Sequence, residues 1–351
     1  MFESLGFETL TAPQAALIFG GAVGLAFGIL AEITRFCFRR ALVGEPSERR
    51  SALGVWLAAL AAALIGTQAA VASGMISFSE HRFFASDLPV AAILAGGLLF
   101  GAGMVLTRGC ASRLTVLSAS GNLRAVFVLL VFAVAAHATL KGVLAPLRTT
   151  LGSVTLPLGE AVSLASLPGG ALLWTALIAA TALLVALRSG ARPLHLGLAV
   201  LLGLLVPAAW VGTGFVLLDE FDPIAHEGLS FTAPFADTLF WTIASTSISA
   251  GFGTGLVGGT LLGALLSALA GRRFAWASFE SPRQTGRYAA GAVMMGVGGV
   301  LAGGCTVGAG LSGVPTLSLA ALLALASIAV GALAADRALS GGRAGAAVPA
   351  E

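Results

Sequence analysis

Cysteines stand in or beside apolar segments of this chain, in surroundings that could give them a chemical role. Cys110 lies within "TRGCASR" (107–113) and Cys305 within "AGGCTVG" (302–308). In both segments a glycine precedes the cysteine, and glycine permits tight turns and close approach of the backbone. If a short helix begins after each turn, its free N–H groups and positive dipole end point at the cysteine. Such a site suits an anion.

The residues around the two turns set what kind of anion would fit. Gly109, Gly303 and Gly304 allow the turns, and Arg108 or Arg113 could add positive charge at the mouth of the site. A thiol is a weak hydrogen-bond donor with a soft, polarizable sulfur. It could therefore contact the terminal sulfur of an ion such as thiosulfate, and weak, repeated contacts suit transport.

Two other readings of these cysteines stay open. Their electropositive surroundings favour a thiolate, which could attack a sulfur donor and leave a persulfide. A free cysteine in an apolar segment also serves simply as a small packing residue. For a single cysteine the packing role is the stronger interpretation. Two cysteines at equivalent positions of an internal repeat, described below, favour a function.

The remaining cysteine, Cys37, lies in "EITRFCFRRAL" among several arginines. Its segment could form the last site of a transport pathway before the cytoplasm. It could equally be an interfacial anchor, since phenylalanine and arginine side chains favour the headgroup region. In the second half of the chain "GRRFAW" stands where the counterpart of this segment is expected, and Ala275 lies near the position aligned with Cys37. Cys37 therefore has no equivalent cysteine.

The composition decides the environment in which these residues work. Of 351 residues 57% are hydrophobic and only 10% are charged, and the mean hydropathy is +0.97. A soluble domain carries about a quarter charged residues, so this composition excludes one. Apolar runs long enough to cross a bilayer predict an all-α polytopic membrane protein with about nine transmembrane helices. We place them near 14–37, 52–75, 88–107, 125–147, 169–188, 194–217, 250–270, 288–303 and 314–336.

A further stretch, 237–249, is too short and polar to cross, and we expect it to be re-entrant or interfacial. The basic residues cluster in alternate loops. By the positive-inside rule this pattern puts the N-terminus outside and the C-terminus in the cytoplasm. The start of the chain lacks the basic leader of a cleavable signal, so the first span is expected to stay.

An internal repeat underlies the two glycine–cysteine turns. Segment 96–121 resembles segment 291–313, and aligning their cysteines also pairs Gly101 with Gly296, Gly103 with Gly298, and Gly109 with Gly304. We expect one membrane domain over 1–351, with halves at about 14–150 and 194–336. The predicted orientation runs the two segments in opposite directions. In many transporters such an inverted repeat places the binding site at the midplane between the halves.

Several functions and partners are not expected. The odd number of cysteines argues against a disulfide framework, and no His/Cys spacing suits a metal. No Walker loop, "HExxH" motif or nucleophile elbow is present. We therefore expect no cofactor, no metal, no enzyme activity and no nucleic-acid partner.

Among other polar residues, Glu32 and Arg35 could pair on one helix turn, His137 and Lys141 share a helix face, and Gln68 could bond between helices.

Three segments together are similar to a known family. "RFCFRRAL" (35–42), "GAGMVLTRGCASRLTVLSASGNLRA" (101–125) and "YAAGAVMMGVGGVLAGGCTVGAGLSG" (288–313) resemble the YeeE/YedE family of sulfur-transport membrane proteins. The resemblance implies an hourglass-like bundle and uptake of thiosulfate or a related anion across the bacterial inner membrane. It also implies that Cys37, Cys110 and Cys305 line the route. Members often work with a small cytoplasmic sulfur-carrier protein, which here we expect to be a separate chain.

The leading hypothesis is therefore an importer of thiosulfate or a similar sulfur oxyanion. Its pathway residues would be Cys37, Cys110, Cys305, Gly109, Gly304, Arg108 and Arg113. A membrane sensor of sulfur status and a persulfide-forming sulfur-transfer protein are the alternatives.

Overall fold

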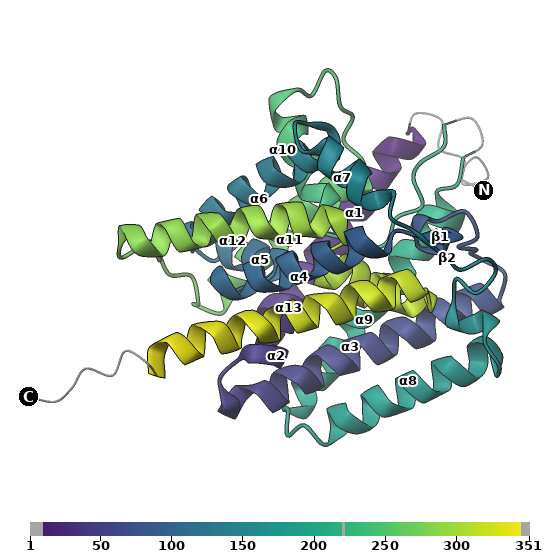
Figure 1. The fold of residues 1–351 in the computed structure, drawn as a ribbon, viewed down its shortest axis with the longest axis horizontal. Helices are drawn as coiled ribbons and strands as arrows, with labels where there is room; N and C mark the ends of the chain where they lie inside the picture. The colour runs from purple at the N-terminus through teal and green to yellow at the C-terminus, as the bar shows by residue number, and fades with distance from the viewer. Residues whose placement is uncertain (1–9, 220–221, 345–351) are drawn as a thin grey trace, which may run out of the picture.

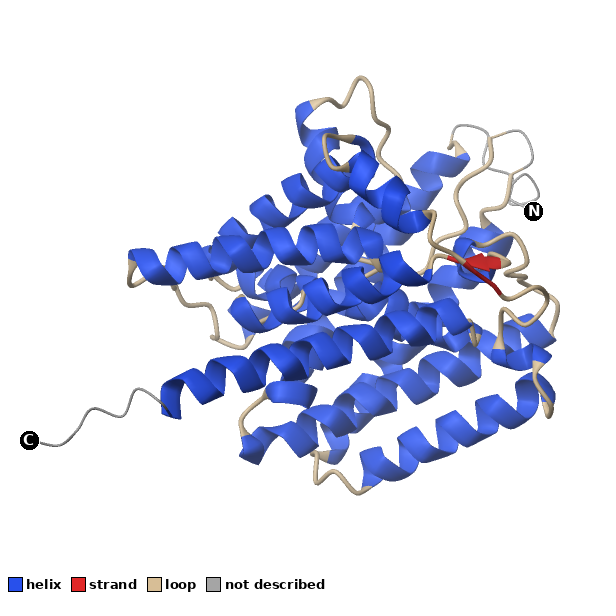
Figure 2. Ribbon diagram, in the orientation of Figure 1, coloured by secondary structure: helices blue, strands red, loops and turns tan. Residues whose placement is uncertain are grey.

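The structure, a computed structural model, describes residues 10–219 and 222–344, with no side chains described beyond residue 340. This part of the chain is almost entirely helical (Figure 2). The exception is a two-stranded antiparallel sheet of β1 (Asp87–Leu88) and β2 (Leu156–Pro157). The predicted all-α fold class is confirmed.

Within the described residues, nine helical segments are long and apolar enough to cross a membrane, as predicted. They are Ala12–Val43, Pro46–Ala72, Val90–Ala119, Leu123–Lys141, Gly170–Leu187, Pro193–Val216, Phe252–Ala270, Pro282–Thr316 and Leu319–Ser340. The first, third and eighth are interrupted at a cysteine, and the others run without such a break.

Each interrupted segment consists of a long helix followed by a short one. The pairs are α1 (Ala12–Thr34) with α2 (Phe38–Val43), α4 (Val90–Leu106) with α5 (Ala111–Ala119), and α12 (Pro282–Leu301) with the π-helix η5 (Thr306–Gly313) and η6 (Val314–Thr316). The prediction of short helices after the glycine–cysteine turns is therefore confirmed.

The other spanning segments are long helices. They are α3 (Pro46–Ala72), α6 (Leu123–Lys141), α8 (Gly170–Leu187), α9 (Pro193–Val211) with the π-turn η4 (Gly212–Val216), α11 (Phe252–Ala270) and α13 (Leu319–Ala344). The remaining elements are η2 (Arg82–Phe84), α7 (Ala145–Gly152), η3 (Leu164–Ser166) and α10 (Ala233–Ile243). The short α10 covers much of the stretch predicted not to span, and it packs on α6 and α11.

Glycines let the central helices approach closely, because in lipid helix association depends on such packing. Gly20, Gly24 and Gly28 of α1 lie directly against the backbone of α11. A Cβ atom on Gly24 would stand only 2.3 Å from the carbonyl oxygen of Leu256. The two helices are therefore in backbone contact along their shared length.

The helix contacts follow a two-fold pattern. α1 packs on α11 as α9 packs on α3, and α4 packs on α13 as α12 packs on α6. α4 and α12 cross between these groups in opposite directions, since Gly96 lies near Ala302 and Gly103 near Gly291. Exchanging α1 with α9, α3 with α11, α4 with α12 and α6 with α13 reproduces the contacts. The inverted repeat stays a prediction, and this pattern favours it.

The bundle has two distinct ends (Figure 1). One end carries β1, β2 and the connections 73–89, 153–169 and 217–232, and we term it the sheet face. The opposite end carries α2 and the connections 188–192 and 271–281, and we term it the arginine face. α8 lies at the periphery, against α3 and η3, outside the two-fold pattern.

The α1–α11 contact generates a stability prediction. Gly24→Ala should lower the free energy of unfolding by about 1–3 kcal/mol, the usual cost of overpacking a tight contact. The change is measured as a lower melting temperature of the purified protein in detergent. Gly21→Ala is the matched control, because a Cβ there would have only one heavy atom at 4.0 Å. Equal melting temperatures of the two variants would contradict the close packing.

Candidate functional site

Each cysteine is the N-cap residue of a short helix inside the bundle. Cys37 caps α2, Cys110 caps α5 and Cys305 caps η5. At this position the free N–H groups of a first helical turn lie next to the cysteine. The thiol of Cys305 accepts a hydrogen bond from the N–H of Gly308 over 3.4 Å. The thiol thus pairs one backbone N–H group of the first helical turn, which lipid could not hydrogen-bond.

The turns before the cysteines use left-handed backbone, and not always at glycine. The left-handed residues are Arg35 (φ 52°), Arg108 (φ 60°) and Gly303 (φ 75°). Gly109 was predicted to allow the second turn, but there the positive φ falls on Arg108. Gly304 (φ 159°) follows Gly303 in the third turn, and a Cβ atom on it would stand 2.8 Å from the Ala309 nitrogen.

The structure brings the three cysteines into one buried row. Their exposed fractions are 5% for Cys37, 1% for Cys110 and 0% for Cys305. The thiols of Cys37 and Cys110 are neighbours that interact directly. Thr306, which follows Cys305 in the chain, also interacts with the Cys110 thiol, and the hydroxyl of Ser112 lies 3.4 Å from it.

The order of the row differs from the simplest expectation. Cys110 and Cys305 are equivalent positions of the predicted repeat, but the thiol that interacts most strongly with Cys110 is that of Cys37. Cys305 lies one step further, within electrostatic range of Cys110. Cys110 is therefore the middle of the row.

The predicted arginines occupy two different environments. Arg113 is half-buried and interacts electrostatically with Cys37 and Cys110, with Arg35 and Arg40 also close to it. Arg108 is exposed, and in the described part of the chain its side chain makes no hydrogen bond to a cysteine. Of these two arginines, Arg113 is therefore the one that lies beside the row.

Two expectations about other polar residues have clear outcomes. Glu32 does not pair with Arg35. It accepts a hydrogen bond of 2.7 Å from Arg273, and another of 2.9 Å from Ser267, because Arg35 sits in the left-handed turn that ends α1. Gln68 does bond between elements, donating to the carbonyl of Pro315 over 2.7 Å.

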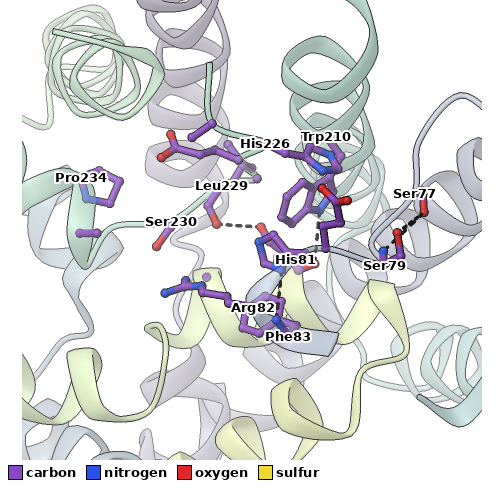
Figure 3. Close-up of a pocket in the computed structure, with 17 residues that line it drawn as sticks. Ser77, Ser79, His81, Arg82, Phe83, Trp210, His226, Leu229, Ser230 and Pro234 are labelled. Carbon is purple, nitrogen blue, oxygen red and sulfur yellow. Dashed lines mark hydrogen bonds between the residues drawn. The ribbon is translucent and has the colours of Figure 1, made fainter. Parts of the chain in front are cut away.

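A cavity of about 710 Å³ opens on the sheet face, and our sequence reasoning gave its residues no role (Figure 3). Its walls come from the connection 77–83, the end of α9, the connection 225–230 and η5. Segments so far apart in sequence carry no shared motif, which is why pattern reading missed them. The polar lining includes Arg82, Glu227, Ser230 and Ser312.

Aromatic rings hold one wall of this cavity in place. Phe78 stacks on His226, with ring centroids 5.3 Å apart and planes 8° apart. Trp210 meets His226 and His81 edge to face, at 4.9 and 5.3 Å. The indole of Trp210 donates to the carbonyl of Ser312 in η5 over 3.4 Å. The wall is thereby joined to the helix that Cys305 caps.

Burial sets the charges in the cavity. It lowers the pKa of His81 to about 4 and lowers that of His226, so both imidazoles are neutral at neutral pH. It also lowers the pKa of Arg82, while Glu227 and Cys305 act in the opposite direction. A guanidinium keeps its proton in proteins. Burial raises the pKa of the Glu227 carboxyl, with Arg82 opposing the rise. Arg82 is therefore the cation of this cavity.

A single residue links the cavity to the cysteine row. Gly308 lines the cavity, and its N–H donates to the thiol of Cys305. Thr306, next to Cys305 in the chain, interacts with the thiol of Cys110. Cys110 interacts with Cys37, and Cys37 interacts electrostatically with Arg113. A series of neighbouring polar groups thus connects the sheet face with the arginine face through the interior of the bundle. Such a buried polar series, among the apolar helices of the described residues, is typical of the transport class of multi-pass membrane proteins.

Comparison with known proteins agrees with this class. The chain matches the family described as "Sulphur transport" over residues 33–334 and belongs to it. This is the YeeE/YedE family whose motifs the sequence resembles.

Two curated relatives share most of the chain. A protein of Escherichia coli (strain K12) named thiosulfate transporter TsuA is 25% identical over 84% of this chain and 87% of its own length. A protein of the same name from Spirochaeta thermophila is 27% identical over 87% of this chain and 93% of its own length.

The order of the cysteine row can be tested by oxidation. Mild oxidation with iodine should join Cys37 to Cys110, since neighbouring thiols need little movement to form a disulfide. Mass spectrometry of the digested protein would detect the two peptides linked with the loss of two hydrogens. Cys305→Ala should leave this bridge intact. A bridge formed mainly between Cys110 and Cys305 would contradict the row.

Proposed function

We propose that this protein carries thiosulfate, or a closely similar sulfur oxyanion, inward across the bacterial inner membrane. The row Cys305–Cys110–Cys37, buried between a polar cavity and an arginine-rich end, is the observation that carries this proposal. Membership of the sulfur-transport family and the names of its two relatives support it. The arginine face would lie in the cytoplasm, with the N-terminus outside and the C-terminus inside.

The row offers the ion weak contacts that can be exchanged in sequence. Each thiol can donate a hydrogen bond to the terminal sulfur of the ion, and the N–H groups of the short helices face its negative charge. Contacts of this strength release as readily as they bind, which conduction requires. Gly109 and Gly304 keep side chains away from the turns that present Cys110 and Cys305.

The arginines would drive exit from the dry centre. A dianion is costly in a medium of low dielectric constant unless a cation lies near. Arg113 provides that cation beside Cys37, and Arg35, Arg40 and the exposed Arg108 continue the positive charge toward the surface. The thiols must stay neutral in this scheme, because a thiolate would repel the ion.

The protein would act as a transporter and not as an enzyme, since no bond of the substrate needs to change. On the cytoplasmic side we propose that a separate, small sulfur-carrier protein receives the ion at the arginine face. The basic side chains exposed there suit a partner with an acidic surface.

Uptake into liposomes tests the proposal. Purified protein should carry labelled thiosulfate inward, and Cys110→Ala and Cys305→Ala should each reduce the rate about 10- to 100-fold, the usual effect of losing a hydrogen bond to an ion. Ser118→Ala, which removes a hydroxyl from the far end of α5, is the matched control and should keep full uptake.

Three outcomes would contradict the proposal. Unimpaired uptake by the Cys110→Ala, Cys305→Ala double variant would exclude the proposed route. Binding of thiosulfate with no flux by any variant would instead favour a sensor of sulfur status. Sulfur added to a cysteine, detected by mass spectrometry after exposure to thiosulfate, would favour persulfide chemistry.

A further inference from the structure

The cavity on the sheet face holds a cation that the protein leaves unpaired. Within the described residues the Arg82 guanidinium makes no hydrogen bond and no ion pair, and its nearest ring is that of Phe83. The cavity keeps it accessible to water while protein encloses it closely enough to lower its pKa. An enclosed charge without a counter-ion attracts one. In Figure 3 the Arg82 side chain extends away from the rings toward the side that Ser230 lines.

A hydroxyl donor and an open backbone accompany this cation. Ser230 makes no hydrogen bond within the described part of the chain, so its hydroxyl is free for a ligand. Opposite it lies Gly308, where a Cβ atom would stand 2.7 Å from the Ser230 oxygen. Ser312 is already committed, because its hydroxyl donates to the carbonyl of Leu229 over 2.7 Å.

Two acids, Glu80 and Glu227, line the cavity together with Arg82, and Glu227 is the one that acts on the guanidinium. Glu227 interacts with Arg82 electrostatically but forms no ion pair with it. Its backbone is held in place by Thr213, whose hydroxyl bonds both the N–H and the carbonyl of Glu227. Glu227 also lines a second cavity of about 360 Å³, together with Lys141 and Asp237. Its carboxylate can therefore weaken the field of Arg82 without occupying the guanidinium.

We propose that this cavity is a capture site for tetrahedral dianions, in which Arg82 supplies the charge, Ser230 a hydrogen bond, and Glu227 an opposing charge that sets the affinity. The ligand class is sulfate as well as thiosulfate. That this binding is the first step of transport rests on the proposed function. That the cavity binds a dianion does not.

The site cannot select for sulfur, because no thiol lines it. Charge and hydrogen bonding to oxygen are common to sulfate and thiosulfate, and the first soft donor is Cys305, beyond Gly308. Selection therefore follows capture. Sulfate should occupy the cavity and compete with thiosulfate for entry while passing the cysteines poorly or not at all.

The protonation of Glu227 controls the strength of capture. The charged and titratable groups facing it are Arg82 on η2, Asp237 on α10 and Lys141 on α6, with Glu80, His81 and His226 on the cavity wall. Burial raises the pKa of Glu227, so its opposing charge is present above that pKa and is lost as the pH falls through it. Dianion affinity should therefore rise toward acid pH. His81, with a pKa of about 4, gains charge only at the acid extreme.

Calorimetric titration of the purified full chain with sulfate, at pH 7 in detergent, tests the site. Arg82→Gln should weaken binding about 10- to 100-fold, and Arg82→Lys should recover part of it, since lysine keeps the charge but not the forked donors. Arg148→Gln removes the same charge from α7, outside the cavity lining, and is the matched control with unchanged binding. Glu227→Gln should bind sulfate more tightly than the unmodified chain above the pKa of Glu227 and should lose most of the pH dependence.

The outcomes separate this inference from the proposed transport. Cys305→Ala should bind sulfate normally yet lose thiosulfate uptake. Sulfate binding that depends on Arg82 without any thiosulfate flux would overturn the transport proposal alone. Equal sulfate affinity in Arg82→Gln and the unmodified chain, or thiosulfate uptake that excess sulfate does not slow, would overturn the capture site. A Glu227→Gln variant with unchanged affinity would remove Glu227 from it.

Discussion

A helix that stops inside a membrane leaves backbone groups that lipid cannot satisfy, and three such interruptions meet in this protein. The rest of the structure follows from covering them. Each interruption restarts at a cysteine in the N-cap position of a short helix, and at Cys305 the thiol itself accepts the N–H of Gly308. Around them the long helices touch backbone to backbone at glycines, for example where Gly24 lies against Leu256. The same arrangement that completes the backbone bonding also gathers soft donors and helix ends in one dry place.

Charge is kept out of the centre and placed at its two ends. Arg82 lies in the cavity of the sheet face, and Arg113 lies next to Cys37 toward the arginine face. Between them the row offers only thiols, the hydroxyls of Thr306 and Ser112, and N–H groups. A full charge at the midpoint would hold an oppositely charged ion too tightly for release, whereas dipoles bind it weakly. The separation of strong and weak sites therefore suits passage better than storage.

The sequence predicted well whatever depends on local pattern. Apolar run lengths gave the nine spans, and the glycine–cysteine segments gave the short helices after Cys110 and Cys305. Contacts between distant segments were not predictable in this way. The pairing of Glu32 with Arg273 depends on α1 lying beside α11, and the cavity of Arg82 and Glu227 joins loops that share no motif. The backbone of Arg108 also escaped prediction, because glycine is the usual residue in a left-handed turn.

The two ends of the pathway differ because the two-fold pattern is broken there. The contacts pair α1 with α9 and α2 with α10, so the equivalent of Cys37 falls before α10 and not near Ala275. At that place Thr232 is the N-cap residue, and the connection 217–232 replaces the tight turn of residues 35–37. The longer connection forms one wall of the wide cavity, while the tight turn places a thiol within reach of Cys110. In the proposed route, the wide end would admit an ion with its water and the narrow end would hold it closely, an asymmetry that two identical halves could not provide.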